Sequence, residues 1–170
     1  MKLLKVLRHL VSFILPVTVL IIVPVSIEDN YSLDGVWSTF LGGLLICVGL
    51  LGIILTVRMF ILIGKGTLAP WDPTRRLVTG SLYGYVRNPM ILGVFTILVG
   101  EAILLASLNI AVWAVAFFII NTLYFILFEE PGLIKRFGEE YMEYKRNVPR
   151  WMPRIKPWYP DKRNMGLTRE

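Results

Sequence analysis

The sequence contains little of what most catalytic and metal sites use. Its 170 residues include one cysteine, Cys47, and one histidine, His9. A single cysteine cannot form an intrachain disulfide or a cluster of thiolate ligands. Because the only histidine lies in the basic N-terminal segment, we expect no Ser-His-Asp hydrolase, no H-E-x-x-H protease and no bis-histidine haem site.

Charged residues are also scarce, at 18% of the chain, whereas 55% of the residues are hydrophobic and the mean hydropathy is +0.63. This composition is typical of a protein that lies in a bilayer. A membrane-spanning helix needs about 20 apolar residues, and four stretches qualify: about 10–27, 36–64, 90–108 and 109–128. The sequence therefore predicts an all-α integral membrane protein with four transmembrane helices, organised as one membrane domain over residues 1–170.

The basic residues flank these stretches on one side: Lys2, Lys5 and Arg8 before the first, Lys65, Arg75, Arg76 and Arg87 between the second and third, and further Lys and Arg from 135 to 169. The connection between the first two stretches carries Glu28, Asp29 and Asp34 instead. By the positive-inside rule, both termini and the central connection are expected to be cytoplasmic. The net charge of +6 then reflects topology, and we expect no nucleic-acid partner.

A polar, aromatic segment meets the third apolar stretch at Asn88-Pro89. Asparagine is a favoured N-cap and proline is tolerated at the first helical position, so a helix is predicted to begin here. The third and fourth stretches are broken only near residues 107–109 and are followed by Glu129-Glu130-Pro131. Two helices folded back on each other lie about 8–10 Å apart, which would place Asn88 close to Glu129.

This arrangement would suit one particular ligand. A helix N-terminus attracts a carboxylate or phosphate. Glu129 and Glu130 can hold hydroxyls or an ammonium group, and Tyr83 and Tyr85 offer aromatic faces to an adenine or a cation. S-adenosylmethionine carries all of these groups. The alternative interpretation is an N-capped helix beside two solvated carboxylates.

The residues after the acidic pair predict cytoplasmic structure at the membrane surface. An apolar stripe with helical spacing indicates an amphipathic helix that docks on the membrane; it comprises Leu133, Ile134, Phe137, Tyr141 and Tyr144. The tail at 148–160 is rich in proline and tryptophan, so we expect it to be extended and folded back on the interface.

Small residues predict where helices approach closely. In the second stretch these include Gly42 and Gly49, which we assign to packing. In the third stretch, Gly93, Gly100 and Ser107 share one face at heptad spacing, and this face is predicted to contact the fourth helix.

The same residues carry a resemblance to a family. The motifs are Tyr83-x-Tyr85-Val86-Arg87-Asn88-Pro89-Met90-x-Leu92-Gly93, then Glu129-Glu130-Pro131, and then Phe137-Gly138-Glu139-Glu140-Tyr141-x-x-Tyr144 with Val148-Pro149 and Pro153. Together, over Gly64 to about Pro157, they resemble the integral membrane methyltransferases of the isoprenylcysteine carboxyl methyltransferase and phospholipid methyltransferase superfamily. The resemblance implies S-adenosylmethionine-dependent methyl transfer at the cytoplasmic face.

The resemblance also implies which residues contact the cofactor: Tyr83, Arg87, Asn88, Leu92, Glu129 and Glu130, with Gly64 and Gly66 as a weaker match. The cofactor-binding segments would be 64–93 and 129–157. The implied acceptor is lipophilic or lipidated, and it is either an isoprenylcysteine-like carboxylate or a phospholipid-like amine. No metal is needed, whereas an amine would require deprotonation, with which Glu130 or Arg150 could assist.

Glu101 lies well inside the third stretch, where an ionisable residue is a functional candidate. Two interpretations of Glu101 stay open: it forms a structural hydrogen bond, or it has a role in substrate access. It also supports an alternative function, a small four-helix transporter that uses Glu101 as its coupling carboxylate. A non-enzymatic membrane scaffold is the third interpretation.

Overall fold

The computed structural model describes residues 15–29, 33, 35–59 and 77–160, and these ranges contain helices and no strand. The elements in order are η1 (Thr18–Ile22), α2 (Val23–Ile27), α3 (Gly35–Met59), η3 (Ser81–Gly84), α4 (Pro89–Leu104), α5 (Leu108–Tyr124), η4 (Phe125–Glu129), α6 (Glu130–Phe137) and α7 (Glu139–Asn147). The predicted helical class is confirmed. Gly64 and Gly66, predicted as cofactor contacts, lie outside the described residues.

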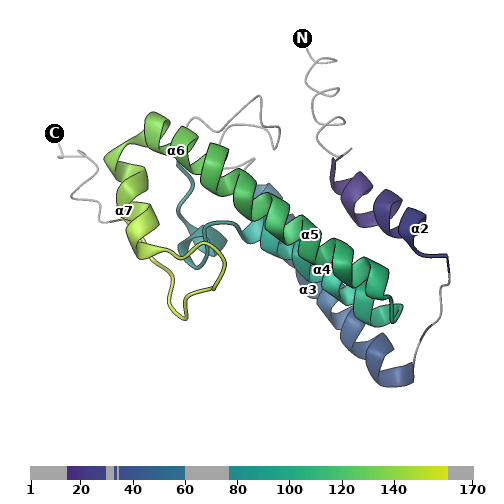
Figure 1. The fold of residues 1–170 in the computed structure, drawn as a ribbon. Helices are drawn as coiled ribbons and strands as arrows, with labels where there is room; N and C mark the ends of the chain where they lie inside the picture. Colours follow the sequence, from purple (N-terminus) through teal and green to yellow (C-terminus); the bar gives the residue numbers. More distant parts are fainter. Residues whose placement is uncertain (1–14, 30–32, 34, 60–76, 161–170) are drawn as a thin grey trace, which may run out of the picture.

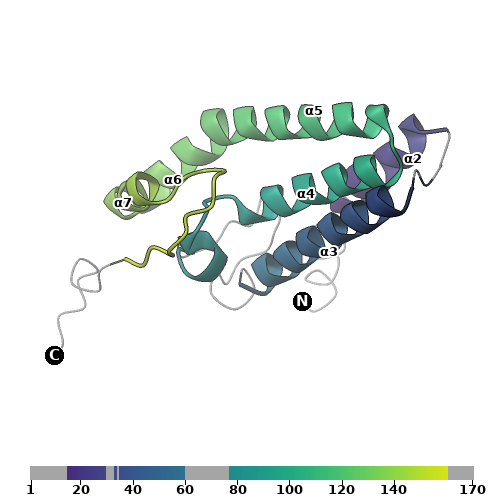
Figure 2. The same ribbon diagram turned by 90° about the horizontal axis from the view of Figure 1, so that it is seen from below.

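The hairpin predicted from the third and fourth apolar stretches is formed by α4 and α5 (Figure 1). As expected, α4 begins after Asn88 with Pro89 in its first turn, although the Asn88 side chain makes no capping hydrogen bond. At the other end, Ser107 caps α5 by accepting a hydrogen bond from the Ile110 N–H. Figure 2 shows that the two helices are closest at this turn and diverge toward α6.

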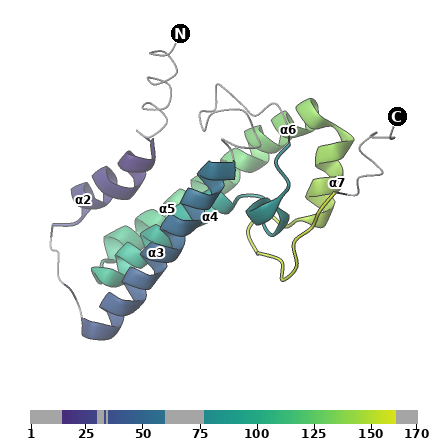
Figure 3. The ribbon, with the colours of Figure 1, turned by 180° about the vertical axis from the view of Figure 1, so that it is seen from behind.

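The first described helices are attached to the turn of this hairpin. The Asn109 Nδ2 donates to the Ile27 carbonyl at 3.1 Å, and the Trp113 Nε1 donates to the Val19 carbonyl at 3.1 Å. The Ser107 hydroxyl donates to the carboxylate of Glu28. The α2 end of the chain is therefore held far from the end of the hairpin at which α4 begins (Figure 3).

Helix α3 packs along α4 through pairs of glycines. A Cβ atom on Gly49 would lie 2.6 Å from the Gly93 carbonyl oxygen, and one on Gly42 would lie 2.7 Å from the Gly100 carbonyl oxygen. The prediction that Gly93 and Gly100 face the fourth helix is therefore wrong. Their backbones are needed for the close approach of α3, because only residues without a side chain allow it. The contact with α5 instead uses larger residues: Val94, Leu98, Ala114 and Phe117.

We expect Gly49→Val to destabilise the protein. The new side chain would overlap the backbone of α4, and inserting methyl groups into a packed contact costs about 1–3 kcal/mol. The measurement is the thermal unfolding midpoint in detergent. Gly43→Val and Gly52→Val are matched controls on the same helix, since a Cβ at either position meets no atom within 4 Å. Equal midpoints for the three variants would contradict this packing.

Within the described ranges, two helices are long and apolar enough to cross a membrane: Gly35–Met59 and the continuous helix Leu108–Phe137. Leu15–Ile27 and Pro89–Leu104 are apolar but shorter. Large apolar side chains cover the outward faces of α3 and α5, among them Trp37, Phe40, Leu44, Leu51, Val112, Val115, Ile119 and Leu123. These faces indicate a chain that associates with a membrane.

The helix after the acidic pair differs from the prediction. Gly138 adopts a φ of +53°, a conformation that favours glycine, and separates α6 from α7. The apolar stripe does not form a membrane-docking face, because Tyr141 and Tyr144 are only 2% and 3% exposed. They pack instead on the segment that precedes α4, around Tyr83 and Val78.

Candidate active site

Three segments meet at the end of the hairpin where α4 begins. They are residues 81–88, helices α6 and α7, and residues 148–158, here called the C-terminal segment. The Arg87 N–H donates to the Pro149 carbonyl at 2.9 Å, the Arg154 N–H to the Tyr85 carbonyl at 3.0 Å, and the Trp158 N–H to the Gly84 carbonyl at 2.9 Å. The C-terminal segment contains bends and no helix or strand, and it lies against the residues before α4. Its predicted position at the membrane interface stays a prediction.

Glu130 joins these segments through ion pairs. Its Oε1 lies 2.8 Å from Arg87 Nη1 and 2.6 Å from Arg150 Nη2, and its Oε2 lies 2.8 Å from Lys145 Nζ. Arg87 Nη1 also donates to the Tyr141 hydroxyl at 3.2 Å. Each cation comes from a different segment, so one carboxylate fixes the start of α4, the end of α7 and the C-terminal segment relative to α6.

The charges of this cluster are not balanced. Three cationic side chains pair with the carboxylate of Glu130, a residue that is only 4% exposed. The adjacent Glu129 is half-buried and forms no ion pair with the residues that the structure describes. The N-terminus of α4 adds a positive partial charge, because its first N–H groups have no partner within the helix. The site therefore favours a ligand that carries a negative group.

Unpartnered donors occur in the same place. Three side-chain nitrogens are buried without a hydrogen-bond partner in the described part of the chain, Arg87 Nε, Asn88 Nδ2 and Trp151 Nε1. The Asn88 residue is only 7% exposed. Leaving a buried donor unsatisfied costs about 1–3 kcal/mol, so buried groups of this kind usually have a partner. A ligand with acceptor oxygens at the start of α4 would supply one.

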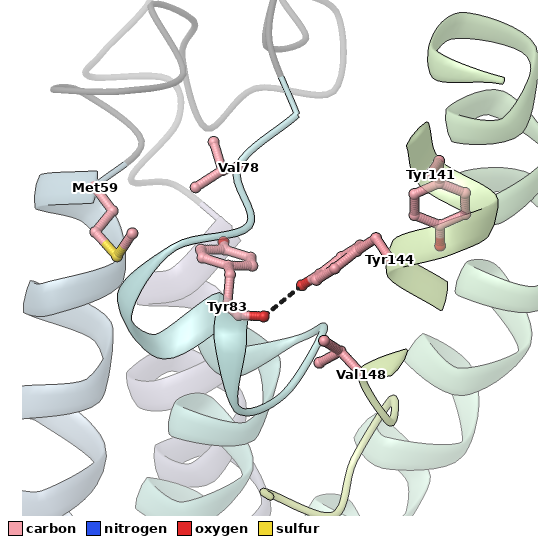
Figure 4. Close-up of a cluster of buried hydrophobic side chains, with 6 residues drawn as sticks. All are labelled: Met59, Val78, Tyr83, Tyr141, Tyr144 and Val148. Carbon is pink, nitrogen blue, oxygen red and sulfur yellow. Dashed lines mark hydrogen bonds between the residues drawn. The ribbon is translucent and has the colours of Figure 1, made fainter. Parts of the chain in front are cut away.

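A second layer of tyrosines supports the residues before α4. The Tyr144 hydroxyl donates to the Tyr83 carbonyl at 2.8 Å (Figure 4). Burial raises the pKa of both phenols well above the ordinary value. The pKa of Tyr141 is also raised, first by burial and then by the charge of Glu130, although Arg87 opposes the shift.

The structure places the predicted site residues unequally. The helix start was predicted to lie close to the acidic pair, with Asn88 near Glu129. The structure brings the residues next to these two together, in the ion pair of Arg87 with Glu130. Leu92 lies one turn into α4, where its N–H donates to the Asn88 carbonyl. Tyr83 is buried among apolar residues, whereas Tyr85 is half-buried. The cofactor contacts themselves stay a prediction.

The sequence does not single out two residues of this site. Lys145 follows Tyr141 by one helical turn, and Trp151 follows Arg150 in the tail that is predicted to lie at the membrane interface. The indole of Trp151 lies against Phe118, with ring centroids 4.8 Å apart, and against Phe125, at 6.2 Å. The sequence signal for each of them is its closeness to a residue of the predicted motifs or site, Tyr141 or Arg150.

Comparison with known proteins gives one family and several relatives. The sequence model of the family described as phospholipid methyltransferase matches residues 37–140. The human protein-S-isoprenylcysteine O-methyltransferase is 38% identical over 89 residues, which cover 49% of this chain and 29% of that protein. The mouse protein of the same name is 36% identical over 89 residues, with the same coverage. The chain thus matches under a third of the length of these relatives. No solved structure matches it significantly.

Proposed function

Because the chain belongs to the phospholipid methyltransferase family, we propose that it transfers a methyl group from S-adenosylmethionine to a lipophilic or lipidated acceptor. The observation that carries this proposal is the set of buried, unpartnered donors at the start of α4, beside the cation-rich cluster around Glu130. The transporter alternative gains no support from the relatives. The names of the relatives and the description of the family both indicate a methyltransferase.

The residues present fit S-adenosylmethionine, which supplies a methyl group activated by a sulfonium. Its carboxylate would take hydrogen bonds from Asn88 Nδ2, Arg87 Nε and the first N–H groups of α4. Glu129 would hold the ammonium group or the ribose hydroxyls, since it forms no ion pair with the described residues and is not fully buried. Tyr85 would contact the adenine. Gly64 and Gly66 are also proposed as cofactor contacts, and only the family resemblance supports them.

The chain mainly has to align two reactants and exclude water. Glu130 and Arg150, the residues predicted to assist deprotonation, are paired with each other at 2.6 Å. A carboxylate stabilised by three cations resists protonation, so in this proposal Glu130 and Arg150 act by holding the C-terminal segment in place. A carboxylate acceptor needs no base, which favours the isoprenylcysteine-like acceptor over the amine.

The proposed topology has four spans. Two are the long helices, α3 and the continuous helix Leu108–Phe137, and two are the shorter apolar helices Leu15–Ile27 and Pro89–Leu104. Among the described residues, Arg58 lies in the last turn of α3, Arg87 precedes α4, and Lys135 and Arg136 lie in the last turn of α6. This distribution supports a cytoplasmic site and cytoplasmic termini. Residues 1–170 would form one membrane domain. An acceptor would then reach the site from the bilayer and the cofactor from the cytoplasm.

We expect Asn88→Ala to weaken binding of S-adenosylmethionine and S-adenosylhomocysteine by about tenfold, because a hydrogen bond to a charged group is worth about 1.5–3 kcal/mol. Glu129→Gln should weaken both ligands as well. The measurement is titration calorimetry on the detergent-purified protein.

Two matched controls separate the site from general damage. Asn109→Ala changes the start of the other hairpin helix, at the opposite end, and Glu140→Gln changes an exposed carboxylate of α7. Both should bind the ligands as the wild type does. Wild-type affinity in Asn88→Ala and Glu129→Gln would remove the proposed cofactor site, and no binding by the folded wild type would remove the proposed function.

A further inference from the structure

The C-terminal segment brings one side chain, that of Trp151, against aromatic residues of the hairpin. Trp151 follows Arg150, which is fixed on Glu130. Its indole contacts Phe118 of α5 and Phe125 of η4, and Phe118 in turn contacts Phe95 of α4, with centroids 4.9 Å apart. The four rings connect α4, α5 and η4 to the C-terminal segment. Figure 2 shows that the ribbons of α4 and α5 diverge toward α6.

The polar atom of this side chain has no partner. Trp151 Nε1 is buried and makes no hydrogen bond with the residues that the structure describes. A buried indole N–H usually finds an acceptor, and the surrounding rings offer none. By contrast, the second tryptophan of the segment, Trp158, packs against Tyr144 of α7, with ring centroids 5.8 Å apart. Trp151 thus offers an aromatic ring and one indole N–H that has no acceptor among the described residues.

The surroundings of Trp151 suit the acceptor better than the cofactor. Phe95, Phe118 and Phe125 are apolar, and the outer face of the same helical stretch exposes Tyr124, Leu127 and Phe128. A lipophilic acceptor would meet these residues from the membrane side. The cofactor is polar and would use the donors at the start of α4, which are Arg87 Nε and Asn88 Nδ2.

We propose that Trp151 determines acceptor specificity: its N–H binds an oxygen of the acceptor's anionic head group, and its ring, with Phe118 and Phe125, contacts the adjoining apolar chain. The inference rests on the proposed methyl transfer and names the substrate chemistry of that site. The shared chemistry is an oxyanion attached to a long apolar chain, whether the oxyanion is the carboxylate of an isoprenylated cysteine or the phosphate of a lipid.

The test is Trp151→Phe, which keeps an aromatic ring and removes the donor. Two probes represent the two sources, an S-isoprenylated N-acetylcysteine and a lysophosphatidylethanolamine, each titrated into the protein in detergent without cofactor. Trp151→Phe should weaken binding of the probe that the wild type binds by about tenfold. It should also raise the KM for that probe and leave the thermal midpoint and the affinity for S-adenosylhomocysteine unchanged.

Two controls make the readout specific to the N–H. Trp158→Phe makes the same change in the same segment and should bind the probes as the wild type does. A neutral analogue, the methyl ester of the first probe or a monoacylglycerol in place of the second, should lose affinity in the wild type and bind equally to wild type and Trp151→Phe.

The outcomes separate the two proposals. If the wild type binds S-adenosylhomocysteine but Trp151→Phe keeps wild-type affinity for the probe, the specificity role of Trp151 is overturned and the proposed function stands. Wild-type binding of S-adenosylhomocysteine with neither oxyanionic probe bound would also overturn it. If the wild type does not bind S-adenosylhomocysteine, the proposed function itself fails.

Discussion

Replacing Glu130 by glutamine is expected to reduce methyl transfer at least about 100-fold and to lower the free energy of unfolding by about 3 kcal/mol. The carboxylate pairs with Arg87, Lys145 and Arg150, and removing one partner of a buried ion pair typically costs about 3–5 kcal/mol. The lower end applies because the Lys145 and Arg150 side chains are 36% and 22% exposed. Activity falls further because a displacement of about 1 Å can cost about 100-fold in rate.

The measurements are the thermal midpoint in detergent and the rate of transfer of a labelled methyl group. Glu139→Gln is the matched control, because its ion pair with Arg146 lies at 3.4 Å on side chains that are 90% and 66% exposed, and exposed pairs contribute little. If Glu130→Gln kept wild-type stability and lost only cofactor affinity, Glu130 would be a direct cofactor contact, as the sequence motif implies, and the clamping role would be wrong.

The parts of the fold that were predictable are those encoded locally. Asn88-Pro89 predicts the start of α4 because capping and the fixed φ of proline act within one turn. The break between α4 and α5 follows from Ser107 in the same way. Since the two helices must then fold back, the proximity of the residues before α4 to the acidic pair also followed, and the ion pair of Arg87 with Glu130 agrees with it.

The parts that were not predictable depend on which faces meet. Gly93 and Gly100 mark a close helix contact, but nothing in their spacing says whether the neighbour is α3 or α5. An apolar stripe such as that around Tyr141 and Tyr144 fits a membrane surface and a protein core equally well. Trp151 illustrates the same limit in the site, because a tryptophan at the membrane interface and one that packs on a helical hairpin look identical in sequence.

The role of the C-terminal segment leads to a prediction that separates position from stability. Gly84→Val is expected to lower kcat/KM about 100-fold or more while the helix content stays near that of the wild type. A Cβ at Gly84 would lie 2.8 Å from the Trp158 carbonyl oxygen and 3.2 Å from Pro157 Cβ. Since the Trp158 N–H also donates to the Gly84 carbonyl, the segment cannot keep this contact and would move away.

The movement would affect catalysis because the same segment carries Arg150 and Trp151. The measurements are kcat/KM, circular dichroism and limited proteolysis, in which faster cleavage after residue 148 would report the release of the segment. Gly80→Val is the matched control in the same connection, because its Cβ meets no atom within 4 Å and its backbone is extended. If Gly84→Val released the segment without loss of kcat/KM, the site would consist of the helix ends alone. Loss of activity in Gly84→Val but not in Gly80→Val would make the C-terminal segment a functional part of the site, held by backbone hydrogen bonds whose partners a sequence motif does not reveal.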